Sequence, residues 1–192
     1  VDYKTGTKKF DLREVYYGLD CQMLLYLFTL ERNGGHLFPQ GTAAGVEYLW
    51  ADPAPENIIR PETDDAEPSQ AQNYPLEGLL LDEPSIYHAM DTRGTGAFVP
   101  LSFSAKTGEP TAQSAKARLA DREKFNRIRD HLDGMLTDMA KNLYSGEIDA
   151  APLVPNAGKS PCLWCEYRTV CRHADGEGER TPLKPDDPFG AE

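Results

Sequence analysis

The sequence has no long hydrophobic run and comparatively few positive charges. No apolar stretch reaches the length of about 18 residues that a membrane-spanning helix needs. The first residues lack the basic and apolar regions of a secretory signal peptide. The 20 Lys and Arg residues are outnumbered by 31 Asp and Glu residues, giving a net charge of -11. This balance argues against a free-standing nucleic-acid-binding protein, because phosphate binding needs a positive surface. From the lack of a membrane-spanning run and of a signal-peptide pattern we expect a cytoplasmic location.

The sequence also lacks a phosphate-binding motif and has few cysteines, and both features limit the functions that the chain can have. The sequence contains no Gly-rich phosphate-binding loop ending in Lys and Ser or Thr, so any helicase or ATPase activity must belong elsewhere. It contains only four cysteines, and three of them, Cys162, Cys165 and Cys171, fall within ten residues. In an intracellular chain such clustering indicates a metal site before a disulfide.

The chain of 192 residues is long enough for one domain with a core, or for a small domain with appendages. Patterning divides it into five parts. We expect an α/β fold with a strand-helix-strand unit at 1–50, a partly flexible insertion at 51–119, a long helix at 120–149, a cysteine segment at 150–174 and a disordered tail at 175–192. The flexible parts are predicted because their sequences are rich in Pro, Gly and acidic residues without periodicity.

The first 50 residues combine strand and helix patterns. Residues 1–6 alternate as a strand and end in Thr-Gly. Asp11 is a good N-cap for one helix over 12–32, which ends before Asn33 and two glycines. Projection at 100° per residue gives two opposite apolar stripes, so we expect this helix to be buried on both sides. The larger stripe comprises Leu12, Val15, Tyr16, Leu19, Met23, Tyr26, Leu27 and Leu30, and the smaller one comprises Tyr17, Cys21, Leu24 and Phe28.

Later elements follow from the same patterns. Residues 44–50 are predicted to form a strand parallel to the first one. Residues 76–91 favour a short strand followed by a short helix, and residues 97–109 alternate as a strand that ends in a turn. A second long helix is predicted over 121–144, and its regularly spaced Met, Leu and aromatic residues are expected to be core.

The first strand and helix carry polar residues with catalytic potential. Asp2 and Lys4 are two apart on a strand, so they share a face at about 7 Å. A carboxylate there suits Mg²⁺ or Mn²⁺, and a neighbouring ammonium could orient water against a phosphodiester. Taken alone, the pair is more typical of a surface salt bridge at the end of a strand than of a catalytic site. Gln22 and Tyr26, four apart, share one face of the following helix.

This combination of Asp-Tyr-Lys on a strand and Gln-x-x-x-Tyr on the next helix resembles the RecB-like branch of the PD-(D/E)XK nuclease superfamily. The resemblance extends through "EGLLLDEPSIYHAMD" and the cysteine cluster. It implies a partial restriction-endonuclease-like core, with residues 1–50 as its C-terminal half. It further implies that Asp2 binds the metal together with the backbone carbonyl of Tyr3, that Lys4 is the catalytic lysine, and that Gln22 and Tyr26 support the site and approach DNA.

In this family another acidic metal ligand comes from an earlier strand, which does not occur in the sequence. We therefore expect the parent protein to be a Mg²⁺- or Mn²⁺-dependent exonuclease and this chain to be inactive alone. The resemblance implies single-stranded DNA as substrate and a role in double-strand-break repair by recombination. The implied partner, reached through the parent protein, is an AddA-like helicase–nuclease subunit.

The cysteine array, C-x2-C-x5-C, leaves two metal centres open. Its spacing suits three ligands of a 4Fe-4S cluster, or a Cys3His zinc site completed by His173. The resemblance favours the cluster, with Cys162, Cys165 and Cys171 as ligands and the fourth cysteine outside this chain. Two alternative functions remain open for the chain. One is a fragment of a stand-alone Cas4-like exonuclease, and the other is a non-catalytic, zinc-stapled module that binds DNA ends.

Overall fold

The computed structural model describes residues 2–4, 10–36, 41–50, 76–96, 98–154, 160–173, 177–181 and 187–190, with only the backbone of residues 2–4 and 50. The chain divides into two compact units, which we describe separately. The first comprises residues 1–10 and 22–126, and the second comprises residues 11–21 and 127–192.

A sheet of four described strands in the order β1-β2-β3-β4 organises the first unit. The strands are β1 (Asp2–Lys4), β2 (Gly45–Trp50), β3 (Leu76–Leu81) and β4 (Leu119–Ala120). β1 runs parallel to β2, β2 antiparallel to β3, and β3 parallel to β4. The predicted parallel pairing of the first two strands is therefore confirmed, and the fold is mixed α/β.

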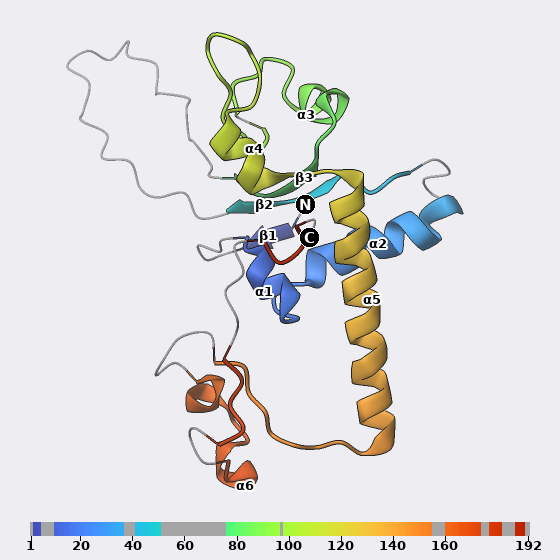
Figure 1. Cartoon of the computed structure of the whole chain (residues 1–192), viewed down its shortest axis with the longest axis vertical. Helices are drawn as coiled ribbons and strands as arrows, with labels where there is room; N and C mark the ends of the chain where they lie inside the picture. The colour runs from blue at the N-terminus through green and yellow to red at the C-terminus, as the bar shows by residue number, and fades with distance from the viewer. Residues whose placement is uncertain are drawn as a thin grey trace, which may run out of the picture. The chain divides into compact units, whose positions relative to one another are not determined.

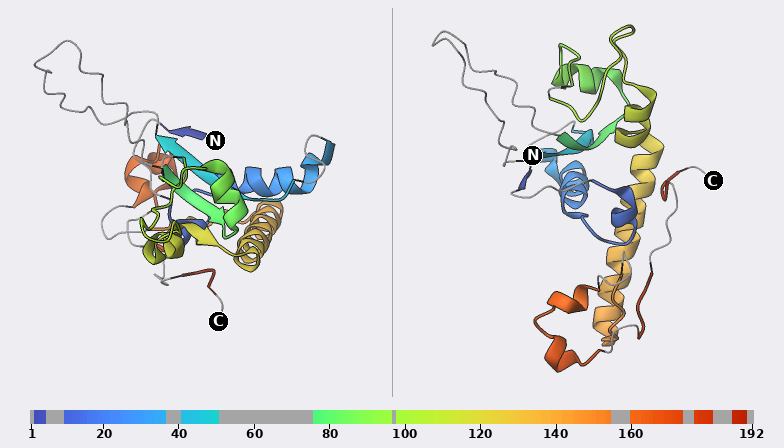
Figure 2. Two further views of the ribbon diagram at one scale, coloured as in Figure 1. Left: turned by 90° about the horizontal axis from the view of Figure 1, so that it is seen from above. Right: turned by 90° about the vertical axis from the view of Figure 1, so that its left-hand side faces the viewer.

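The two faces of this sheet are covered by different helices (Figures 1 and 2). One face carries α3 (Pro84–Met90) and α4 (Ala112–Arg118), around a buried apolar cluster. The cluster contains Leu80, Tyr87, Val99, Leu101 and Leu119. The opposite side carries α2 (Gln22–Asn33), which is followed by the 3-10 helix η1 (Gly34–His36). The ring of Phe28 in α2 meets Phe125 in α5 (Arg122–Ser145) edge to face, with centroids 6.4 Å apart.

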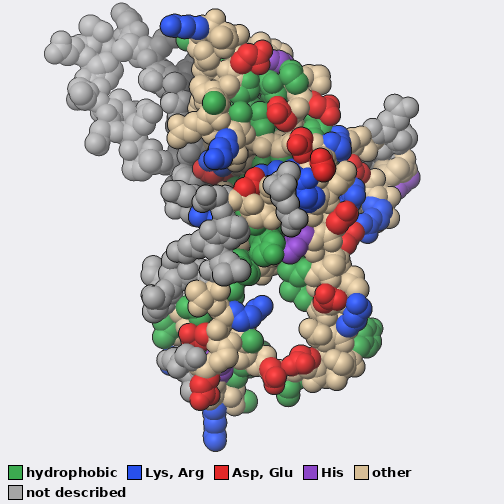
Figure 3. Space-filling model, viewed as in Figure 1, with side chains coloured by type: hydrophobic (Ala, Val, Ile, Leu, Met, Phe, Trp, Pro, Cys, Tyr) green, Lys and Arg blue, Asp and Glu red, His purple; other side chains and the backbone are tan. Residues whose placement is uncertain are grey.

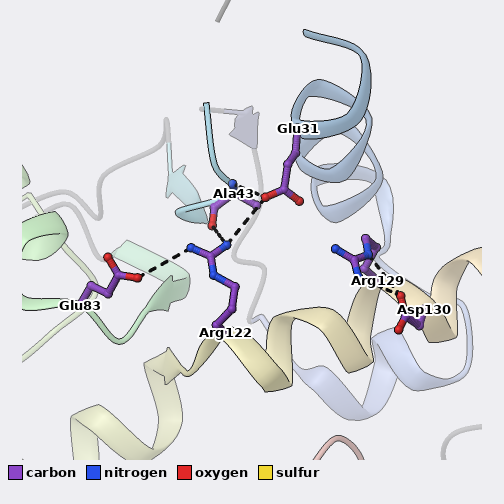
Figure 4. A network of polar contacts seen from close by, with 6 residues as sticks. All are labelled: Glu31, Ala43, Glu83, Arg122, Arg129 and Asp130. Carbon is purple, nitrogen blue, oxygen red and sulfur yellow. Dashed lines mark hydrogen bonds and ion pairs between the residues drawn. The ribbon is translucent and has the colours of Figure 1, made fainter. Parts of the chain in front are cut away.

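Arg122, the first residue of α5, joins several parts of this unit (Figure 4). Its guanidinium lies 3.7 Å from carboxylate oxygens of both Glu31 in α2 and Glu83 before α3, and it donates to the carbonyl of Ala43 at 3.4 Å. Glu31 also accepts a 2.8 Å hydrogen bond from the backbone N–H of Ala43. The segment that leads into β2 is thus fixed between α2 and α5.

The prediction of one continuous helix over 12–32 is wrong. The structure has two helices, α1 (Leu12–Tyr16) and α2, which are separated by a turn. In this turn Gly18 has φ +82° and Asp20 has φ +56°, and such left-handed conformations end a right-handed helix. A side chain at Gly18 would also have its Cβ 2.8 Å from the sulfur of Met135. The predicted N-cap is confirmed, because the Asp11 carboxylate accepts from the N–H of Arg13.

The turn also changes which apolar stripe is buried. In the described chain Cys21, Leu24 and Phe28 of the smaller stripe are buried. Tyr26 and Leu30 of the larger stripe are 55% and 49% exposed. The expectation of burial on both sides is therefore wrong for α2, because a projection through the turn assigned one phase to two separate helices.

Most later predictions in the first unit are confirmed, with one clear exception. β3, α3 and α5 occur where the sequence indicated. Residues 98–109 do not form the predicted strand, and their only described ladder contact is an isolated bridge between Phe103 and Pro110. Proline supplies no N–H for a ladder, and the intervening residues close a turn with a 2.8 Å bond from Ser104 N–H to the Glu109 carbonyl. Helix α4 was not predicted, and the acidic stretch at 51–75 lies outside the described residues.

The second unit contains α1, most of α5, the 3-10 helix η2 (Pro161–Trp164) and α6 (Arg168–Cys171). Tyr16 stacks on His131 at 4.7 Å, and Phe189 meets both rings edge to face. Arg180 forms an isolated parallel bridge with Leu153. None of the helices described here is both long enough and apolar enough for a bilayer.

The core prediction for α5 holds only for its first half. Phe125, Ile128 and Leu132 are buried, whereas Met139 and Leu143 are 49% and 81% exposed. The apolar residues keep their helical spacing to the end of α5, but in the second half of the helix no described residues bury them.

Candidate functional site

β1 places the predicted catalytic strand at an edge of the described sheet. Asp2 pairs with Tyr48 and Lys4 pairs with Trp50 in the parallel register. Tyr48 in turn pairs with Glu77 of β3, so Asp2, Tyr48 and Glu77 occupy one row across three strands. The side chains of Asp2, Tyr3 and Lys4 lie outside the described part, and their predicted roles remain predictions.

The first turn and a half of α2 presents the second predicted pair. The amide nitrogen of Gln22 donates to the hydroxyl of Tyr26 at 3.0 Å. Both side chains are exposed, so neither is a core residue. The structure confirms that the two residues share a helix face, as the spacing of four indicated. A hydroxyl and an amide held together on an accessible surface are suitable for hydrogen bonds to a polar substrate.

Glu77 and Arg118 form a polar connection that the sequence reasoning missed. Glu77 is only 14% exposed, and its carboxylate forms an ion pair with Arg118 at the end of α4. The same oxygen accepts from the backbone N–H of Phe10 at 3.4 Å, and the Phe10 ring lies 6.0 Å from that of Tyr48. Glu77 thus connects Phe10 to β3 and α4. Its position within the otherwise apolar strand "LEGLLL" was the available signal.

Glu47 in β2 is a second acidic residue that was not singled out. One carboxylate oxygen is buried and has no hydrogen-bond partner among the described residues. Burial raises the pKa of Glu47 from 4.5 to about 7. Its Cα partner on β3 is Gly78, so it occupies a different row from Asp2, Tyr48 and Glu77. Consecutive side chains of a strand point to opposite faces, so Glu47 and Tyr48 lie on opposite faces of β2.

The residues of β1 do not by themselves fit a complete Mg²⁺ site. Mg²⁺ requires near-octahedral oxygen coordination, and Asp2 with the Tyr3 carbonyl offers one carboxylate and one carbonyl. Within the described residues, no three His, Cys, Asp or Glu side chains lie close enough together to hold a metal ion. Additional ligands are needed before this strand can retain a hard cation.

The cysteine segment has suitable ligand chemistry but not a gathered ligand set. Cys162 lies in η2, Cys165 caps it and Cys171 ends α6, and all three thiols are free. The Nε2 atom of His173 is buried without a hydrogen-bond partner in the described chain. No three of these side chains lie close enough together in the described chain to hold a metal ion, and the iron–sulfur or zinc centre stays a prediction.

Charges of both signs are interspersed over the visible surface (Figure 3), and the described residues form no continuous basic face on that side. This distribution agrees with the acidic composition. Broad, sequence-independent attraction to DNA is therefore weak over this face, and contacts with a polyanion would have to be local.

Comparison with known proteins gives a consistent result. The profile of the PD-(D/E)XK nuclease superfamily matches residues 1–172. The ATP-dependent helicase/deoxyribonuclease subunit (AddB) of Clostridium botulinum (strain Loch Maree) is 30% identical over 176 residues. The proteins of the same name from Clostridium kluyveri and Exiguobacterium sibiricum are 31% and 30% identical over 180 and 179 residues. Each match covers 90% of this chain and 15% of the relative, so the chain spans only a small part of these proteins.

Proposed function

Because the chain belongs to the PD-(D/E)XK nuclease superfamily, we propose that it supplies the C-terminal half of a metal-dependent deoxyribonuclease site in a helicase–nuclease. The observation that carries this proposal is the order of motifs on consecutive elements. Asp2 and Lys4 lie on β1, and Gln22 and Tyr26 lie together near the start of α2. The names of the matched relatives, in which helicase and deoxyribonuclease occur together, support the proposed context.

In the proposed site Asp2 and the Tyr3 carbonyl hold part of the shell of a divalent cation, which would activate water and stabilise charge on the phosphate. The Lys4 ammonium orients the attacking water or neutralises the phosphodiester oxygen next to it. Gln22 and Tyr26 hydrogen-bond the DNA backbone or the site. The proposed substrate is single-stranded DNA. The proposed partner, which the parent protein would bind, is an AddA-like subunit. The proposed process is double-strand-break repair by recombination.

Cleavage in a longer protein that also carries the upstream strands provides the main test. Asp2→Ala and Lys4→Ala should each lower the rate of Mg²⁺-dependent cleavage on the order of 100-fold or more while the far-UV circular dichroism stays unchanged. Lys141→Ala is the matched control, because Lys141 is 70% exposed and its described ion pair is with Asp138 on the same helix. Cleavage that is unaffected by either site variant would disprove the assignment.

The chain alone should not cleave DNA, because its own oxygen ligands do not complete the metal shell. Robust Mg²⁺-dependent cleavage by this chain, abolished by Lys4→Ala, would contradict that expectation. The alternative, a fragment of a stand-alone Cas4-like exonuclease, is tested by the coding sequence upstream, because a helicase-like region there would support the helicase–nuclease subunit instead.

For the cysteine segment we propose a 4Fe-4S cluster with Cys162, Cys165 and Cys171 as three of its ligands. The fourth cysteine would come from outside this chain. The free thiols and their spacing support soft-metal binding. The buried Nε2 of His173, which has no partner in the described chain, favours the alternative Cys3His zinc site, in a non-catalytic DNA-end-binding module. Metal and sulfide analysis of the longer protein after anaerobic purification separates the two: iron with sulfide supports the cluster, and zinc without iron excludes it.

A further inference from the structure

The first unit contains a pocket of about 530 Å³ between α4 and the residues at 96 and 99–102. Part of its lining is apolar, and the rest consists of backbone, hydroxyl, amide and guanidinium groups. Arg118 is the only charged residue in the described lining. Ser102, Thr111, Gln113 and Ser114 are polar residues of the lining.

The wall of this pocket is held in place by a buried carboxylate. Asp91 is 1% exposed and accepts from the N–H of Arg93 at 3.2 Å and from the N–H of Gly96 at 2.7 Å. Gly96 has φ +75°, and a Cβ there would lie 2.4 Å from the Leu101 carbonyl oxygen. On the other side, the N–H of Ser102 donates to the Ser114 hydroxyl at 2.9 Å. The pocket is therefore preorganised by contacts that do not involve a ligand.

Arg118 gives the pocket its chemical preference. The side chain is 23% exposed, and its Nη1 atom forms the ion pair with Glu77. A guanidinium has five N–H donors in a planar fork, so one ion pair leaves donors that suit the oxygens of a phosphate. Glu77 itself is not among the lining residues, so no carboxylate of the described lining competes inside the pocket.

The sequence around the pocket is nearly neutral although the whole chain is acidic. Between residues 76 and 118, the span of the lining, four positive residues stand against five negative ones. The positive residues are Arg93, Lys106, Lys116 and Arg118, and the negative ones are Glu77, Asp82, Glu83, Asp91 and Glu109. The chain as a whole has a net charge of -11. An anion therefore meets little net negative charge around this pocket, and any attraction to it is local to Arg118.

We propose that this pocket binds a backbone phosphate of single-stranded DNA, as a contact point separate from the candidate catalytic strand. The inference rests on the proposed nuclease function, which supplies the polyanion. Glu77 connects the two places: it pairs with Arg118 on one side and lies in the same sheet row as Asp2 on the other. A strand held at Arg118 would be retained on the unit that carries Asp2 and Lys4.

The test measures binding of fluorescein-labelled dT12 to this chain by fluorescence anisotropy in EDTA, at low and at moderate salt. Gln113→Glu places a negative charge in the pocket at an exposed helix position, so the fold is retained. It should weaken binding about fivefold or more, because like charges face each other at the phosphate. Lys116→Gln is the matched control, because it changes the net charge by the same amount on the same helix outside the lining. It should weaken binding less than about twofold.

A second experiment compares dT12 with dTMP, and so distinguishes a DNA backbone phosphate from the phosphate of a free nucleotide. Amide resonances of Ser102 and Ser114 should shift on addition of dT12, whereas dTMP at the same phosphate concentration should leave them unchanged. Equal weakening by Gln113→Glu and Lys116→Gln, absence of saturable dT12 binding, or equal shifts with dTMP would each overturn the proposal. Because the assay involves neither metal nor cleavage, such a failure leaves the nuclease assignment intact, and loss of that assignment would come from the Asp2 and Lys4 variants instead.

Discussion

Arg122 at the start of α5 lies 3.7 Å from the carboxylate of Glu31 near the end of α2. The same guanidinium reaches Glu83 and the Ala43 carbonyl, so one side chain joins two helices and the approaches to β2 and α3 (Figure 4). The contact therefore contributes to the packing of the sheet and of its covering helices.

Replacing Arg122 with Met should lower the free energy of unfolding by about 1–2 kcal/mol, because Glu31 and Ala43 lose a partly buried partner. Urea denaturation followed by circular dichroism measures this change. Arg129→Met is the control, since Arg129 pairs with its exposed neighbour Asp130 in the described contacts, and it should change stability by less than about 0.5 kcal/mol. Equal effects of the two substitutions would show that the Arg122 network is not stabilising.

Gly78 and Gly134 should respond in opposite directions to substitution by Ala. A Cβ at Gly78 would lie 2.1 Å from the Val46 carbonyl oxygen of the neighbouring strand, so Gly78→Ala should lower stability by about 2 kcal/mol or more. At Gly134, within α5, a Cβ meets no described atom within 4 Å. Gly134→Ala should therefore raise stability by up to about 1 kcal/mol through helix propensity. Thermal and urea unfolding of both variants test this pair, and a stable Gly78→Ala variant would contradict the described register of β2 and β3.

The stability of the fold should depend on pH through Glu47. Its pKa is about 7 in the folded protein and 4.5 when the group is unperturbed. Between these values the folded chain binds more protons than the unfolded chain, so this group makes stability fall as pH rises from about 4.5 to 7. Glu47→Gln should remove that part of the pH dependence and be more stable than the original chain at pH 8, by about 1 kcal/mol after allowance for partial exposure. Urea midpoints at pH 5.5 and 8 give the comparison, and identical pH profiles would exclude a buried Glu47.

Cys21 should differ sharply in reactivity from the other thiols. Burial, assisted by the nearby Asp20 charge, raises its pKa to about 11, and its Sγ donates to the Leu19 carbonyl at 3.3 Å. At pH 8 the reactive thiolate is thus scarce. Iodoacetamide labelling with mass spectrometry, under metal-free and reducing conditions, should modify exposed Cys165 and Cys171 first, and Cys21 only after unfolding. Labelling of Cys21 at the rate of Cys165 in the folded chain would show that it is not a buried residue.

Local sequence patterns predicted much of the framework because they report local physics. The N-cap at Asp11, the long helix α5 and the parallel pairing of β1 and β2 follow from capping, helical periodicity and connection length. The spacing of Gln22 and Tyr26 likewise predicted their shared helix face. Where the helical projection failed, between α1 and α2, a glycine and an aspartate in left-handed conformation interrupt an otherwise continuous apolar pattern.

The kinds of element, the superfamily and the residue types of the candidate site could all be read from the amino-acid order, because these depend on near neighbours and on short motifs. Which stripe of α2 is buried, and which polar groups meet, depends on packing between distant segments. Glu77 and Arg118 are 41 residues apart, and neither has a local pattern that indicates the other. Their ion pair exists because β3 and the end of α4 pack together, and the same packing forms the pocket beside them.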